Sequence, residues 1–311
     1  TLFIQSVGTA QETFVKVEVE AGYNISTLDE TTFWQKRNVY GTLQQAGNKG
    51  YLSQLSVVHG YTKGNKYQYE IKGGTWFNLE NYSKIILTEL NAKIIHKGKY
   101  LSFGRLREHL GLNDSTTSSG SFSFSHNALP IPQAKIGIQN YQQLIFPNLF
   151  VKGHFSHGWF GNQTFAQKHF LHQKSINFRI GKEYNKYNAY FGILHNAQWG
   201  GVPKYDLTDR HARFINGKFP TGWYTYRNIV LPLFNPRKDS LSNISSFDYE
   251  NRFGNHIGQI NLGASINRPF SQIMVYKEIP FETGQTFSSF TNIDDGLYGI
   301  SYISKLSKPF I

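Results

Sequence analysis

The sequence predicts an all-β fold, an antiparallel transmembrane β-barrel, on the strength of its composition and its residue alternation. Of 311 residues, 39% are hydrophobic and 16% are aromatic. This balance suits a barrel with a polar lumen and aromatic rims better than it suits a soluble core. Apolar and polar residues alternate along much of the chain, and helical periodicity is scarce. About twelve runs alternate in this way, and several reach the ten or so residues that a tilted strand needs to cross a bilayer.

Individual alternating segments predict where the strands lie and which way their side chains point. The clearest of them are 14–23, 67–74, 86–94, 176–180 and 259–266. The residues that we expect to point outward toward lipid in two of these segments are Ile86, Leu90, Ile94, Ile260, Leu262 and Ile266. On the opposite, lumen-facing sides, we expect Lys93 and Arg179 to pair with internal carboxylates such as Glu89.

Turn signals and one helical signal complete the expected organisation. Lys63-Gly64-Asn65, Lys97-Gly98-Lys99 and Asn185-Lys186 have the composition of turns between strands. A short helix is expected over 221–231, after Pro220, within a non-strand insertion of about 200–250. No apolar run approaches the roughly 18 residues of a spanning helix, and no linker divides the chain.

The two ends of the chain predict a signal-peptide remnant at the start and an incomplete barrel at the end. Residues 1–11 have the apolar stretch and small residues of the end of a signal peptide, with an ordinary first strand as the alternative. Residues 12–311 then form the N-terminal portion of a single barrel domain. The chain stops just after a strand beginning near Leu297, so we expect the closing strands of the barrel to be missing.

Polar residues are concentrated in one glycine-punctuated segment, 104–132. Its candidate ligand-binding residues are Arg105, Arg107, Glu108, Asn113, Asp114 and Asn127. Within it, the alternating run 121–125 is expected to be a strand, followed by a corner at Pro130-Ile131-Pro132. Long polar insertions between strands usually carry function, so this segment is expected to plug the lumen, to contact ligand, or to do both.

Several chemistries have no support in the sequence. The chain has no cysteine, which excludes disulfides, thiolate catalysis and zinc-finger or iron–sulfur sites. The 11 histidines never occur as His-x-His or His-x-x-x-His, so no metal or cofactor is expected. Glu108 and Asp114 are the one candidate carboxylate pair, and we expect them to be salt-bridged to Arg105 or Arg107 instead. The sequence has neither a nucleophile elbow nor a phosphate-binding loop, so an enzyme is not expected.

Charge and aromatic residues indicate the kind of partner. The net charge of +12 is the difference between 32 basic and 20 acidic residues. The basic residues are spread along the chain, which disfavours a nucleic-acid surface. Acidic polysaccharide or lipid headgroups remain as partners. Trp159 and Trp199 lie beside hydrogen-bonding residues, the latter near His195, as sugar-binding aromatics do. The alternative for each tryptophan is an anchor at the membrane interface.

Four blocks of the chain resemble the Wzi capsule-assembly family of outer-membrane proteins, particularly its Bacteroidota-type members. They are GRLREHLGLNDSTTSSGSFSFSHNALPIP (104–132), KGHFSHGWF (152–160), FLHQKSINFRIG (170–181) and LHNAQWGG (194–201). The resemblance covers most of 13–311. It implies a barrel of roughly eighteen strands plugged by loops and helices, in the outer membrane of a Gram-negative cell. The twelve or so alternating runs are too few for such a barrel.

The resemblance also implies a function, that of a non-enzymatic lectin that binds capsular polysaccharide and helps to attach it to the cell surface. Its expected partners are surface polysaccharide and outer-membrane lipid. The alternative functions are a diffusion porin or an accessory barrel of an export complex, and a barrel enzyme that modifies glycans. The expected polysaccharide contacts are the candidate residues of 104–132 together with Trp159, His195 and Trp199.

Overall fold

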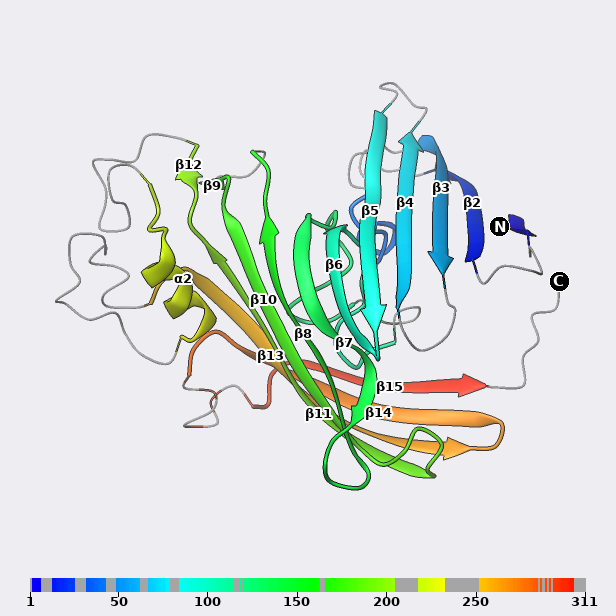
Figure 1. The fold of residues 1–311 in the computed structure, drawn as a ribbon, viewed down its shortest axis with the longest axis vertical. Coiled ribbons are helices and arrows are strands. Elements are labelled where there is room, and N and C mark those ends of the chain that lie inside the picture. Colours follow the sequence, from blue (N-terminus) through cyan, green and yellow to red (C-terminus); the bar gives the residue numbers. More distant parts are fainter. Residues whose placement is uncertain are drawn as a thin grey trace.

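The computed structural model of the chain is dominated by one large antiparallel sheet (Figure 1). The structure describes residues 2–6, 13–25, 32–42, 49–61, 67–78, 84–114, 118, 120–162, 166–204, 218–232, 252–284, 286, 289, 291 and 293–304. The strands are β1 (Leu2–Ser6), β2 (Thr13–Ile25), β3 (Lys49–Tyr61), β4 (Gln68–Asn78), β5 (Lys84–His96), β6 (Lys99–Arg105), β7 (Gln133–Gln143), β8 (Leu149–Trp159), β9 (Ala166–Gln167), β10 (Phe170–Ile180), β11 (Tyr187–Trp199), β12 (Val202–Pro203), β13 (Asn255–Arg268), β14 (Ser271–Phe281) and β15 (Leu297–Ser304). The helices are α1 (Phe33–Lys36) and α2 (Trp223–Val230).

The described strands form a 13-stranded sheet in which neighbours in space follow one another along the chain. The order is β1-β2-β3-β4-β5-β6-β7-β8-β10-β11-β13-β14-β15, with β9 and β12 forming a separate two-stranded ribbon. The antiparallel all-β prediction is therefore confirmed. β1 and β15 lie at the two edges of this order, paired with β2 and β14 respectively. Among the described residues the expected strand near Leu297 does not pair with the strand over 13–25.

The two faces of the sheet differ in polarity, and the polar one is buried. We call the inner face the one that carries buried polar side chains: Thr88, Glu89, Asn91, Ser102, Gln133, Lys135, Ser156, Gln173, Arg179, Asn188, Asn196, Gln259, Asn261, Ser265 and Glu278. We call the outer face the one that carries exposed apolar side chains: Ile71, Leu90, Ile94, Leu101, Phe103, Ile136, Phe155, Ile176, Ile180, Tyr187, Phe191, Leu262, Ile266, Val275 and Ile300. This is the reverse of a water-soluble sheet, which buries its apolar side.

One residue expected to point outward points inward. Leu90 and Ile94 are exposed as predicted, but Ile86 is buried against Trp76, with Val39 and Leu129 packed beside them. The reason is a β-bulge, because the pairing of β4 with β5 shifts register between Gly74 and Thr75. A bulge inserts one extra residue and reverses the alternation beyond it.

The connections at the two ends of the sheet differ in length. At one end, the short-turn end, β5–β6, β7–β8, β10–β11 and β13–β14 are joined by residues 97–98, 144–148, 181–186 and 269–270. At the other, the loop end, the connections include 26–48, 106–132, 200–254 and 282–296. The predicted turn at Lys97-Gly98 is confirmed, and both residues have the positive φ of a tight hairpin turn, 49° and 76°.

The helix predicted over 221–231 is confirmed as α2, which lies beside β10 (Figure 1). Its buried Ile229 packs with Ala197, Trp199 and Phe253 in a small apolar cluster. No helix in the described part of the chain combines the length and the apolar character that crossing a membrane requires. Within the segment 1–11, residues Leu2–Ser6 form β1, and the signal-peptide interpretation of that segment stays a prediction.

Candidate functional site

The candidate site is built on residues 106–132, which we call the inner segment because it lies against the inner face of the sheet. Gly104, the second-last residue of β6, precedes this segment and has a φ of +124°. A Cβ atom at this position would collide with the backbone carbonyl oxygen of Leu90, so the position requires glycine. Most of the described part of the inner segment has no regular secondary structure.

At the β5 side, two arginines hold the beginning of this segment to the wall. The Arg107 backbone N–H donates to Glu89 Oε1 at 3.0 Å, and its Nη2 donates to Thr88 Oγ1 at 3.0 Å. Arg105 Nη1 donates to the Leu87 carbonyl oxygen at 2.6 Å. Both arginines are therefore bonded to β5. The carboxylate involved, Glu89, pairs with Arg107 and not with Lys93 as expected.

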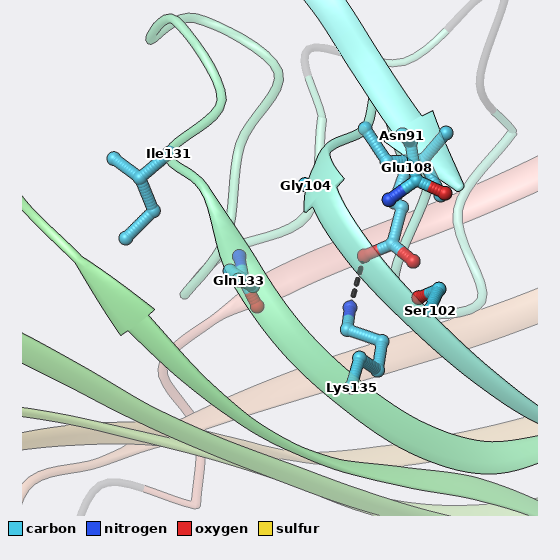
Figure 2. Close-up of a pocket in the computed structure, with 8 residues that line it drawn as sticks. Asn91, Ser102, Gly104, Glu108, Ile131, Gln133 and Lys135 are labelled. Atoms are coloured by element: carbon cyan, nitrogen blue, oxygen red, sulfur yellow. Dashed lines mark hydrogen bonds and ion pairs between the residues drawn. The ribbon is translucent and has the colours of Figure 1, made fainter. Parts of the chain in front are cut away.

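Glu108 takes a different partner from the one predicted. Its carboxylate forms an ion pair with Lys135 of β7, whereas the sequence suggested Arg105 or Arg107 (Figure 2). Burial alone would raise the pKa of Glu108, but the positive charge and hydrogen bond of Lys135 outweigh it and lower the pKa. The pair lies in a small cleft that Asn91, Ser102 and Gln133 also line (Figure 2).

On the far side, the fully buried Glu278 of β14 gathers four donors from the inner segment. Its Oε1 accepts the Leu112 N–H at 3.1 Å and Asn113 Nδ2 at 2.9 Å. Its Oε2 accepts Ser121 Oγ at 3.1 Å and the Phe122 N–H at 2.9 Å. A carboxylate with this many donors is well compensated for its burial. Glu278 is thus the main anchor of the inner segment on β14.

Gln259 of β13 binds Ser121 and Ser123 of the inner segment. Its Oε1 accepts hydrogen bonds from Ser121 Oγ, the Ser123 N–H and Ser123 Oγ, each at 2.8 Å. These side-chain acceptors take the place of a strand partner, so residues 121–125 do not form the strand that their alternation predicted. The inner segment therefore reaches across the inner face from β5 to β14.

A second stretch, residues 32–42, is bound to the inner segment and carries an exposed tryptophan. Arg37 Nη1 donates to the Ser118 carbonyl oxygen at 2.7 Å, and the Asn38 N–H donates to Asn127 Oδ1 at 2.9 Å. Trp34 is 69% exposed, and the Arg37 guanidinium lies 5.3 Å from its ring centroid. Trp34 could not be predicted as a site residue, because no pattern within its own segment shows that it lies beside residues 118–127.

Two histidines of the inner segment form a contact that depends on their being neutral. His109 Nδ1 lies 3.2 Å from His126 Nε2, and His109 Nε2 lies 2.6 Å from the Asn113 carbonyl oxygen. Burial lowers the pKa of both side chains, and the neighbouring His109 lowers that of His126 further. Since two imidazolium groups at this distance would repel each other, the arrangement favours the neutral forms.

The nine predicted ligand residues do not converge on one site. Arg105, Arg107, Glu108, Asn113, Asp114 and Asn127 belong to the inner segment or to the end of β6 that leads into it. Trp159, His195 and Trp199 lie on the opposite, outer face of the wall, where Phe170 pairs with both tryptophans in register. Trp199 and His195 are buried there, and the Tyr226 ring of α2 packs 5.4 Å from Trp199.

Sequence reasoning missed Glu278, the residue that fixes much of the site. Its signal was a carboxylate in the middle of a strand that is otherwise mostly apolar, SQIMVYKEIPF, because such a charge is buried only with partners.

Comparisons with models of known families and with curated proteins find no match to this chain. No cluster of three or more metal-ligating side chains occurs within the described ranges. The function is therefore inferred from the polarity of the two faces of the sheet, from the lengths of the connections at its two ends, and from the inner segment.

Proposed function

We propose that this chain belongs to an outer-membrane protein whose strands cross the membrane and whose loop end binds surface polysaccharide. The membrane assignment rests on the reversed polarity of the sheet, with an exposed apolar outer face and a buried polar inner face. In water, an apolar surface of this extent is unfavourable, because its burial is the main driving force of folding. When the outer face contacts lipid, its apolar side chains are no longer exposed to water and this unfavourable free energy is absent.

The dimensions of the outer face support this assignment. On β5 the outward side chains from Ile85 to Ile94 are all apolar, Leu87, Leu90 and Ala92 included. This stretch covers about 30 Å of strand, and at a tilt of about 40° it spans about 23 Å. The apolar band of outer-membrane barrels has a height of about 25 Å.

The difference between the two ends supports an orientation. Outer-membrane barrels have short turns on the periplasmic side and long loops on the cell exterior. The connections 97–98 and 269–270 belong to the first kind, whereas 106–132 and 200–254 belong to the second. The loop end, with the inner segment and residues 32–42, then faces the cell exterior.

The polysaccharide assignment rests on Trp34 and its surroundings. An exposed indole can stack on the C–H face of a sugar, and the adjacent Arg37 offers donors to hydroxyl or carboxylate groups. Arg37 also holds this platform to Ser118 of the inner segment, so the platform has a fixed base. Asp114 and Asn127 are the next proposed contacts. The resemblance of four sequence blocks to the Wzi family favours capsular polysaccharide as the ligand.

A diffusion porin is the second candidate, and the inner segment argues against it. This segment is anchored to Glu89 on one side and to Glu278 and Gln259 on the other. A loop held at both walls narrows the space that a freely conducting pore would need. A tethering or lectin role is compatible with such a loop.

The proposal is tested with Trp34→Ala in a capsulated cell that depends on this protein. Capsule retention should fall, and binding of purified capsule to the solubilised full protein should weaken by tenfold or more. Tyr184→Ala is the matched control, because Tyr184 is also exposed but lies at the short-turn end. If the wild-type protein binds no glycan and conducts ions in planar bilayers, the porin function replaces the lectin function as the proposal. Wild-type protein recovered in a soluble fraction would overturn the membrane assignment.

A further inference from the structure

A second polar cluster lies on the inner face at the short-turn end, away from the Trp34 platform. It comprises Lys152 of β8, Arg179 of β10 and the aromatic side chains Tyr141 and Phe150. In the register of β8 with β10, Arg179 pairs with Phe150, and Asn177 pairs with Lys152. Lys152 and Arg179 therefore lie on the same face, one inner-face position apart along adjacent strands.

The guanidinium of Arg179 is held in place by aromatic rings and by one hydrogen bond. Its Cζ lies 4.8 Å from the ring centroid of Tyr141 and 4.9 Å from that of Phe150. Its Nε donates to the Gly181 carbonyl oxygen at 3.1 Å. Only 8% of the residue is exposed. These contacts leave the two Nη groups of the fork without an acceptor among the described residues, and that edge is the one that binds oxyanions.

Lys152 adds a second positive charge to the same place. Its Nζ lies 5.0 Å from the ring centroid of Tyr141, the same ring that Arg179 contacts. The Tyr190 ring, 6.3 Å from Tyr141, extends the aromatic side of the cluster. Among the described residues, neither Lys152 nor Arg179 forms an ion pair with a carboxylate, contrary to the sequence expectation for Arg179.

The inner-face carboxylates whose side chains the structure describes on β4, β5 and β14 are engaged elsewhere. Glu70 pairs with Lys72, and Glu89 binds Arg107 of the inner segment. Glu278 is surrounded by the donors of the inner segment. Arg179 is buried and Lys152 is half-buried. Two adjacent cations that lack a counter-charge among the described residues repel each other and lose hydration, which is unfavourable unless an anion compensates them.

We propose that Lys152 and Arg179 form an oxyanion-binding site that takes a carboxylate or phosphate group. The Arg179 fork binds two oxygens of the group, and the Lys152 ammonium neutralises its charge. Tyr141 and Phe150 fix the fork in advance, so little side-chain freedom is lost on binding. The site lies at the end opposite to Trp34, and it depends neither on the membrane assignment nor on the polysaccharide assignment.

Titration calorimetry on the full protein in neutral detergent tests the site, with inorganic phosphate and glucuronate as separate probes in a low-chloride buffer. Wild-type protein should bind at least one probe, and Lys152→Gln with Arg179→Gln should weaken that binding by tenfold or more. Arg227→Gln, which removes an exposed cation on α2, is the control and should bind as wild type does. A preference for phosphate or for glucuronate assigns the ligand to phosphorylated or to uronic-acid compounds.

Further variants keep the result interpretable. Arg179→Lys retains the charge without the fork and should bind more weakly than wild type but more strongly than the double variant. All variants are compared with the wild type by circular dichroism, and only folded protein is titrated. Absence of binding by the wild type, or unchanged binding by a folded double variant, would overturn the site. The Trp34→Ala result is independent of both outcomes.

Discussion

Thr88 and Glu89 are consecutive residues of β5, yet both side chains are buried on the inner face of the sheet. The β-bulge opposite Gly74 and Thr75 makes this possible, because it places two residues of β5 where one would normally lie. Arg107 binds both of these side chains, since its side chain donates to Thr88 and its backbone N–H donates to Glu89. The bulge thus builds the β5 anchor of the inner segment.

We predict that Glu278→Gln releases the inner segment from β14. Glutamine removes the charge and replaces one acceptor oxygen with an amide that faces donors, which should cost about 2–4 kcal/mol. Hydrogen exchange of residues 112–122 should become faster, as read by mass spectrometry. Glu183→Gln is the matched control, because Glu183 is exposed on the turn between β10 and β11. Unchanged exchange in Glu278→Gln would show that this carboxylate is not an anchor.

A second prediction separates lipid from water as the environment of the outer face. Leu90 and Leu231 are almost equally exposed, at 56% and 55%, but Leu90 lies in the middle of the apolar band and Leu231 follows α2. Leu90→Arg should cost about 2–4 kcal/mol near the bilayer midplane. Leu231→Arg should have little effect. Unfolding by urea in lipid vesicles measures both, and equal small effects would count against a membrane location.

Site-specific labelling checks the assignment of faces residue by residue. The chain has no cysteine, so a single introduced cysteine carries the only label. Ile176 lies on the outer face of β10, and the next residue, Asn177, points to the inner face. A fluorophore on Ile176→Cys should be quenched by lipids with a spin label in the acyl chain, and one on Asn177→Cys should not. Equal quenching at the two positions would be incompatible with the assigned faces.

Acid should loosen the inner segment. The pKa of Glu108 is lowered in the folded protein, so its contribution to stability is present above its unfolded value of 4.5 and is lost as pH falls through the folded value. The pKa values of His109 and His126 are lowered from 6.5, so their contribution is full above pH 6.5 and declines below it. Protease cleavage within 106–132 should therefore increase from pH 7 to pH 4. His126→Gln should reduce the change between pH 7 and pH 5.

The sequence was sufficient to predict an antiparallel all-β fold, because strand alternation and turn composition are local properties. The helix α2 followed from Pro220 and from the interruption of the strand alternation over 221–231, and the hairpin turn followed from Lys97-Gly98. Ile86 was assigned to the wrong face because a bulge depends on how β5 pairs with β4. No property of residues 84–94 alone reveals that pairing.

The candidate site was less accessible to sequence reasoning, since its contacts join distant parts of the chain. Residues 121–125 alternate like a strand, but Gln259 and Glu278 supply acceptors that satisfy their donors in an irregular conformation. Trp34 gains its surroundings only through the bond of Arg37 to Ser118. Local patterns predict a functional role for the inner segment, but its bonding partners within the protein are set by tertiary structure.

The anchoring of the inner segment has a consequence for the order in which the protein assembles. Ser121 and Glu278 are separated by 157 positions in the chain, so the segment emerges from synthesis long before its main acceptor does. Closing so long a loop is slow, and it follows the formation of the local hairpins. Docking of the inner segment is therefore a late event that requires β14 to have joined the sheet. Until then the hydrogen-bond donors of the inner segment are available to chaperones, and the inner face of the sheet stays accessible to water.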